Sequence, residues 1–288
     1  MSRAAPRLAF PAAFAVTALV AAACVAPAGA TNPSASPSAV IDPDRVVIRV
    51  DWEGGFVPPG INLSRLPVLL VMADGRVITQ GPQDAMYPGP LLPNLQVRTL
   101  KPDTLADLLD RAADDGLLVD AAYPGGPIAD AATTVLRITV DGVTYTQSAY
   151  ALFESLDANG AEQPAGTPDA EGRAAMRSFL DALTGLPDSA YSDASTSYVA
   201  DGLRIYSSAY VPDPAADWLP VEWPLDDLAT AGESAGEGLG IRCQVVTGDD
   251  LTTVLPLLEG ANSATPFRSG GTDYTLTARP LLPGERGC

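Results

Sequence analysis

The sequence predicts an α+β protein: a mainly antiparallel β-sheet built from Asp-Gly hairpins, with two or three packed helices. Three observations lead to this fold class. Strand-like alternation begins at Arg45, three Asp-Gly pairs each lie between strand-like runs, and apolar stripes at helical spacing separate these runs. With 288 residues, of which 47% are hydrophobic, the chain has enough material for a sizeable core.

The first predicted strand covers residues 45–52, where apolar and polar side chains alternate. The apolar positions expected on one face, toward the core, are Val46, Ile48, Val50 and Trp52. Arg49 and Asp51 are expected on the other face. A continuous apolar run at residues 68–72 predicts a strand that is buried on both faces.

Three hairpins are predicted, because Asp-Gly supplies the positive φ angles of a two-residue turn between antiparallel strands. They turn at Asp74-Gly75, Asp141-Gly142 and Asp201-Gly202. Residues 273–280 predict a final strand in which Tyr274, Leu276 and Ala278 share one face.

Three helices are predicted, over residues 102–115, 168–184 and 248–260. The first has leucines at helical spacing and aspartates opposite them, which we interpret as a solvated face. The second is expected to begin after Thr167 as its N-cap. In the third, Pro256 is expected to kink or shorten the helix.

Charge and composition exclude several classes of function. The chain has 17 basic and 35 acidic residues, for a net charge of −18, and such a surface repels nucleic acids. It has no histidine, which excludes Ser-His-Asp and Cys-His catalysis and histidine-ligated metal sites. Residues 157–172 begin like a calcium loop but lack the acidic and glycine positions of an EF-hand. We therefore expect no metal, no other cofactor and no nucleic-acid partner.

The N-terminus has the layout of an export signal: two arginines, an apolar run over residues 8–20, and then small residues. Cleavage before Cys24, in "VAAAC", gives a signal peptide over residues 1–23 and a lipid-attached Cys24. The rival cleavage, after Ala30, gives a secreted protein instead. Residues 24–44 are rich in Pro, Ala and Ser, as a tether to a membrane is.

Either cleavage leaves Cys243 and Cys288 as a pair in an exported chain. Export places them in an oxidising compartment, which predicts a disulfide between them. Closing a loop of about 46 residues contributes roughly 4 kcal/mol to stability in the chain-entropy model.

The folded part divides at the polar, turn-rich residues 187–197. This predicts an α+β module over residues 45–188 and a smaller one over residues 196–288. The alternative is one continuous domain in which this segment is a surface loop.

The runs "DGRVITQGP", "YPGPLLPNLQVRTL" and "ARPLLPGE" resemble those of uncharacterised exported lipoproteins from high-GC Gram-positive bacteria. The resemblance spans most of the folded region. It implies a place at the extracytoplasmic face of the cell membrane and no particular activity.

The segment "DWEGGFVPPG" holds the candidate ligand loop, with Asp51, Trp52, Glu53 and Phe56. Aromatic rings beside carboxylates suit sugar binding, and a carboxylate pair is the minimum for a glycosidase. The other interpretation makes Trp52 a core residue followed by a turn. We expect a lipid-anchored binding or scaffold protein with an envelope protein or glycan partner and no catalytic residues. The alternative is a carboxylate-dependent hydrolase of envelope glycan.

Overall fold

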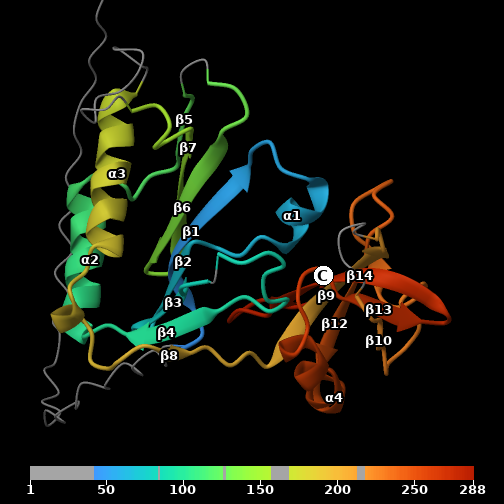
Figure 1. The fold of residues 1–288 in the computed structure, drawn as a ribbon. Coiled ribbons are helices and arrows are strands. Elements are labelled where there is room, and N and C mark those ends of the chain that lie inside the picture. Colours follow the sequence, from blue (N-terminus) through green and yellow to red (C-terminus); the bar gives the residue numbers. More distant parts are fainter. Residues whose placement is uncertain (1–41, 84, 126–127, 157–168, 213–217) are drawn as a thin grey trace, which may run out of the picture. The chain divides into compact units, whose positions relative to one another are not determined.

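The computed structural model describes residues 42–83, 85–125, 128–156, 169–212 and 218–288. The sites predicted at Cys24 and Ala30, most of the tether and residues 157–168 of the calcium-like segment lie outside these ranges. The described part is an α+β protein with two mostly antiparallel sheets (Figure 1), which confirms the predicted fold class. No helix in these ranges is both long enough and apolar enough to cross a membrane.

The first sheet has eight strands among the described residues. In spatial order they are β5 (Ala121–Tyr123), β7 (Val143–Tyr150), β6 (Ala132–Val140), β1 (Val46–Gly54), β2 (Leu69–Met72), β3 (Arg76–Gln80), β4 (Leu95–Thr99) and β8 (Thr196–Ser197). All neighbours pair antiparallel except β5 and β7, which are parallel. The hairpins predicted at Asp74-Gly75 and Asp141-Gly142 are present, since they join β2 to β3 and β6 to β7. The predicted two-residue turn is confirmed at Asp141-Gly142 only, because Asp74 does not adopt a positive φ angle and Ala73 adds a third residue to that connection.

The second sheet has six strands among the described residues. In spatial order they are β10 (Val221–Glu222), β13 (Pro266–Ser269), β14 (Thr272–Pro280), β9 (Gly202–Ala209), β12 (Arg242–Thr247) and β11 (Glu233–Ser234). Only β10 and β13 run parallel among these pairs. The first sheet ends at β8 and the second begins at β9, on either side of Asp201. Whether the chain forms one domain or two stays a prediction.

The hairpin predicted at Asp201-Gly202 is wrong. β8 pairs with β4 in the first sheet, whereas β9 pairs with β12 and β14 in the second. Gly202 does not adopt a positive φ angle. A Cβ atom there would lie 2.8 Å from Thr247 Cγ2 and 2.9 Å from Leu281 Cδ1, so this glycine permits close packing and does not form a turn.

The described residues contain four α-helices: α1 (Pro59–Ser64), α2 (Pro102–Asp114), α3 (Ala170–Thr184) and α4 (Gly248–Glu259). A 3-10 turn, η1 (Asp188–Ala190), follows α3. The helix α4 continues three residues beyond Pro256 instead of ending there. The missing N–H of Pro256 leaves the Thr252 carbonyl without its helical donor, and both residues are exposed, so water can satisfy that carbonyl.

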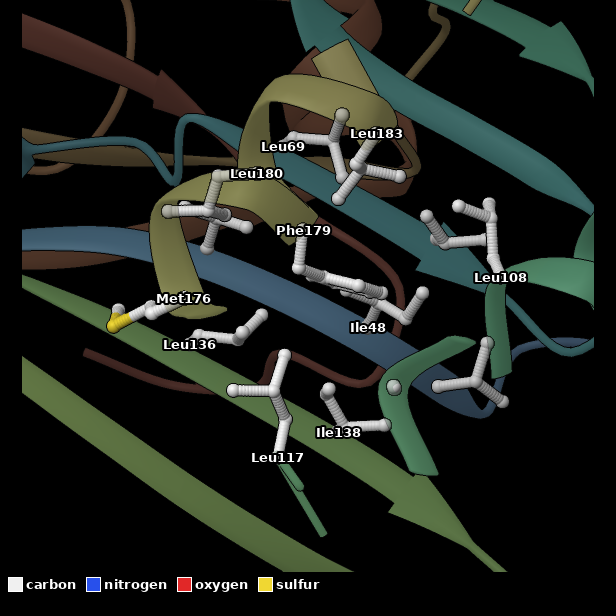
Figure 2. Close-up of a cluster of buried hydrophobic side chains, with 14 of the residues drawn as sticks. Ile48, Leu69, Leu108, Leu117, Leu136, Ile138, Met176, Phe179, Leu180 and Leu183 are labelled. Atoms are coloured by element: carbon white, nitrogen blue, oxygen red, sulfur yellow. The ribbon is translucent and has the colours of Figure 1, made fainter. Parts of the chain in front are cut away.

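The first apolar core lies between one face of the first sheet and the helices α2 and α3, as Figure 2 shows. Phe179 and Met176 of α3 are fully buried against Ile48 of β1 and Leu136 of β6. Helical spacing brings the α3 residues onto one stripe, and strand alternation brings the sheet residues onto one face. The larger members of this core are labelled in Figure 2.

The strand β2 is buried on both faces, as its apolar run predicted. Leu69 and Val71 lie in the first core, whereas Leu70 and Met72 lie in a smaller cluster with Leu282, which follows β14. A residue beyond the second sheet therefore covers the back of the first sheet.

The strand β1 departs from its predicted alternation at a bulge. Its register with β2 shifts between Val46 and Ile48, so Val46 packs in the small cluster with Leu282 while Val47 enters the first core. Ile48 and Val50 are buried as predicted, but Trp52 is half exposed. One extra residue on one strand reverses the faces of all residues before it.

A second apolar core lies under α4, on one face of the second sheet. Val254 and Leu258 of α4 pack with Leu276 and Ala278 of β14 and with Trp223. Trp223 meets Phe267 edge to face, with ring centroids 6.1 Å apart.

Candidate functional site

The candidate ligand loop lies at the end of β1, where the two carboxylates share one face. Asp51 is 8% exposed, and its Oδ2 lies 2.8 Å from Arg49 Nε and 2.7 Å from Arg137 Nη1. Glu53 Oε1 lies 2.8 Å from Arg137 Nη2. Arg137 of β6 therefore holds both carboxylates, and the sheet brings these charges together as pairs.

The aromatic residues of the loop do not join this charged cluster. Trp52 lies between Asp51 and Glu53 along the strand, so its side chain points to the opposite face. It is 50% exposed, and Phe56 beyond it is 84% exposed. Arg65 fixes the end of β1 by donating to the carbonyls of Trp52 and Gly54, at 2.9 and 3.0 Å. The ligand-loop assignment stays a prediction, with Trp52 and the two carboxylates on different faces of β1.

The predicted disulfide is confirmed: Cys243 of β12 is bonded to Cys288, with the sulfur atoms 2.08 Å apart. The segment before Cys288 is also tied by hydrogen bonds. Arg204 Nε donates to the Gly287 carbonyl at 2.6 Å, and the Tyr198 hydroxyl donates to the Leu281 carbonyl at 2.9 Å. Burial, with a smaller effect from the charge of Asp201, raises the pKa of Tyr198 to about 12.

A cluster of one carboxylate and three arginines lies beside this segment. Glu285 accepts two hydrogen bonds from Arg279, at 2.5 and 2.8 Å, and its oxygens lie 3.7 Å from Arg49 and 3.8 Å from Arg204. Burial raises the pKa of the Glu285 carboxyl, but the hydrogen bonds and charge of Arg279 outweigh burial, and the pKa lies below its usual value. The arginines come from β1, β9 and β14, so no local sequence pattern marks this cluster.

Two hollows flank residues 198 and 199, the connection between the two sheets. The first, which we call the tail pocket, has a volume of about 600 Å³ and is polar, with Asp44, Arg76, Asp201 and Glu285 in its wall. The second, which we call the α4 groove, has a volume of about 320 Å³ and is mainly apolar. Its lining residues are Leu92, Pro93, Asn94, Leu95, Ser197, Tyr198, Val199, Ala200, Leu203, Leu251, Leu255, Glu259 and Pro280.

Within the described ranges no three His, Cys, Asp or Glu side chains lie close enough to hold an ion. The aspartates on α2 are spread along its outer side, and Asp107, Asp110 and Asp114 are exposed. This arrangement agrees with their interpretation as a solvated face.

No known protein family matches the chain, and no curated protein or solved structure is significantly similar to it. The resemblance to exported lipoproteins therefore stays an expectation from the sequence.

Proposed function

We propose that this protein is a membrane-anchored extracytoplasmic lipoprotein that binds or scaffolds a component of the cell envelope and has no enzymatic activity. The observation that carries the proposal is the disulfide between Cys243 and Cys288. Disulfides persist in oxidising compartments, which supports export. This pairing also leaves Cys24, the third cysteine of the chain, for the lipid at the end of the apolar run.

The non-enzymatic role is supported by the state of the two candidate acids. A glycosidase needs two carboxyl groups that face the scissile bond, separated by about 5 to 10 Å. Here the oxygens of Asp51 and Glu53 bond to the same guanidinium group, that of Arg137. In a hydrolase the two carboxyl groups face the substrate. In this protein Asp51 and Glu53 face the guanidinium group of Arg137.

The anchor is tested by metabolic labelling with a palmitate analogue. We expect label on the wild-type protein and on the Cys243→Ala/Cys288→Ala variant, but none on Cys24→Ala, which leaves the membrane fraction. Label and membrane association that survive Cys24→Ala contradict the anchor. An intact mass that equals the mass of an unlipidated chain beginning at Thr31 identifies the secreted alternative.

The role is tested in two arms. Wild-type protein incubated with purified cell-wall glycan is expected to release no reducing ends. Release that is abolished in Asp51→Asn/Glu53→Gln, with the fold intact by circular dichroism, identifies the hydrolase instead. Crosslinking in cells, followed by affinity capture, is expected to recover one envelope component reproducibly. Recovery equal to that of an unrelated tethered protein contradicts the binding role.

A further inference from the structure

We propose that the α4 groove and the free edge of β8 together form a docking site for an extended, basic peptide segment of a partner protein. The proposal rests on the binding function proposed above and adds the chemistry of the partner. Three features of the described residues support it: an apolar hollow, an open strand edge and a negative rim.

The hollow is built to receive an apolar side chain. Leu251 and Leu255 lie one helical turn apart on α4, and with Leu92 and Leu203 they form much of its wall. Val199 stands at its border and is 83% exposed. Covering such a surface removes apolar area from water, which is the main source of affinity at small docking sites.

The open strand edge runs directly into this hollow. Among the described residues, β8 is the last strand of the first sheet and pairs with β4 on one side only. The Tyr198 N–H donates to the Leu95 carbonyl at 2.9 Å, so the alternation of antiparallel pairing turns the N–H groups of Ser197 and Val199 away from β4. An added strand can accept from these groups, which is the geometry of β-strand addition.

Charge selects the partner. Glu259 is the one acidic side chain of the groove lining, and it continues the stripe of Leu251 and Leu255 on α4. It lies at the C-terminal end of the helix, where the backbone carbonyls add negative potential. The whole chain carries a net charge of −18, so a segment rich in Lys or Arg is attracted and an acidic one is repelled.

The test uses a fluorescein-labelled synthetic peptide, Lys-Thr-Val-Leu-Val-Thr-Lys with blocked ends, and follows binding by fluorescence anisotropy. Three variants of the full chain address the three features. Ser197→Pro removes the outward N–H but keeps the pairing with β4, Val199→Lys adds a cation at the border of the hollow, and Glu259→Lys reverses the rim charge. Each is expected to weaken binding by about tenfold, the effect of losing one or two good contacts.

Matched controls separate docking from general attraction to an acidic protein. Asp107→Lys makes the same charge change as Glu259→Lys on the exposed side of α2, and Thr253→Gln alters the exposed side of α4. Both are expected to change the affinity by less than about twofold. A peptide with Glu in place of Lys, and one with methylated backbone nitrogens on the pairing side, are both expected to bind at least about tenfold more weakly.

The outcomes separate this proposal from the proposed function. Binding that is equal in the three groove variants and in wild type overturns the docking site. So does a dimer of this chain that sediments as one species and is lost in Val199→Lys, since a second copy then occupies the groove. If the envelope component captured in cells is also captured by Ser197→Pro/Val199→Lys, the binding function stands and the docking site falls. If wild type captures nothing specific, the binding function itself falls.

Discussion

The two sheets are stabilised by different kinds of interaction. The first sheet has apolar side chains on both faces of β2, with α2 and α3 on one side and Leu282 on the other. The second sheet has one apolar face under α4, and on its other face Arg204 and Arg279 stand directly opposite each other. Like charges in such a pair repel, and Glu285 between them offsets the repulsion.

This difference shows that one chain can stabilise one sheet by apolar burial and another by covalent and ionic links. A sheet covered on both faces gains its stability from burial, which is sensitive to cavities. A smaller sheet with one apolar face and one polar face needs specific ties on the polar face, and here these are the disulfide and the Glu285 cluster. The four predictions below test this contrast, from the largest expected loss of stability to the smallest.

The largest loss is expected for Phe179→Ala in the first core. Phe179 is fully buried between α3 and the sheet, so its removal leaves a cavity and lowers the free energy of unfolding by about 3–5 kcal/mol. Urea denaturation followed by circular dichroism measures this loss. The exposed Val143→Ala is the control, with a change within about 0.5 kcal/mol. A loss of similar size in both variants contradicts a core at this position.

Removal of the disulfide is expected to cost about 4 kcal/mol, because a loop of about 46 residues is opened in the unfolded chain. The variant is Cys243→Ala/Cys288→Ala, compared with wild type in the same denaturant series. Reduction of the wild-type protein is expected to give the same midpoint. A loss below about 1 kcal/mol means that hydrogen bonds such as Arg204 to Gly287 suffice for the second sheet.

Glu285→Gln is expected to cost about 3 kcal/mol at pH 7, because Arg279 is left buried without its carboxylate. The pKa of Glu285 is lowered on folding, so its contribution is fully present above the usual value of 4.5 and is lost as pH falls through the folded value. The difference between wild type and variant therefore shrinks on acidification below about pH 4.5.

The control for this pH dependence is Asp110→Asn on the exposed side of α2. It is expected to change the free energy of unfolding by less than about 0.5 kcal/mol at either pH. A difference between wild type and Glu285→Gln that is constant from pH 7 to pH 3 contradicts an ionic role for Glu285.

The smallest effects distinguish two glycines that each follow an aspartate. Gly142 has a φ of +80° and open space around it, so Gly142→Asn is expected to cost less than about 1 kcal/mol. Gly202 lies against Thr247 and Leu281, so Gly202→Asn is expected to cost about 1–3 kcal/mol. Thermal melts of the two variants give the comparison. A larger loss at Gly142 contradicts the packing role of Gly202.

These glycines also show how far the sequence could predict the fold. Local patterns located α2, α3, α4 and two hairpins, because propensity and periodicity act within about ten residues. The predicted N-cap of α3 at Thr167 is wrong, since the helix begins at Ala170 with Asp169 as its N-cap. The same Asp-Gly signal failed at Gly202, where packing against distant residues decides the backbone. The bulge in β1 was equally hidden, since it depends on the register with β2.

The candidate sites divide in the same way. The disulfide could be predicted because cysteines are few and their pairing follows from counting. The Glu285 cluster and the α4 groove could not, since their residues come from both sheets and from connections between them. The link between Asp51, Glu53 and Arg137 likewise depends on which strand lies beside β1.

The strand order has a consequence for incomplete versions of the chain. In the first sheet the earliest strand, β1, is an inner strand, so later strands add around it. In the second sheet the latest strand, β14, lies between β13 and β9, which leaves β9 with an open edge until residues 272–280 have been made. Open edges pair readily with other chains. A chain truncated shortly before Thr272 is therefore expected to aggregate through the open edge of β9.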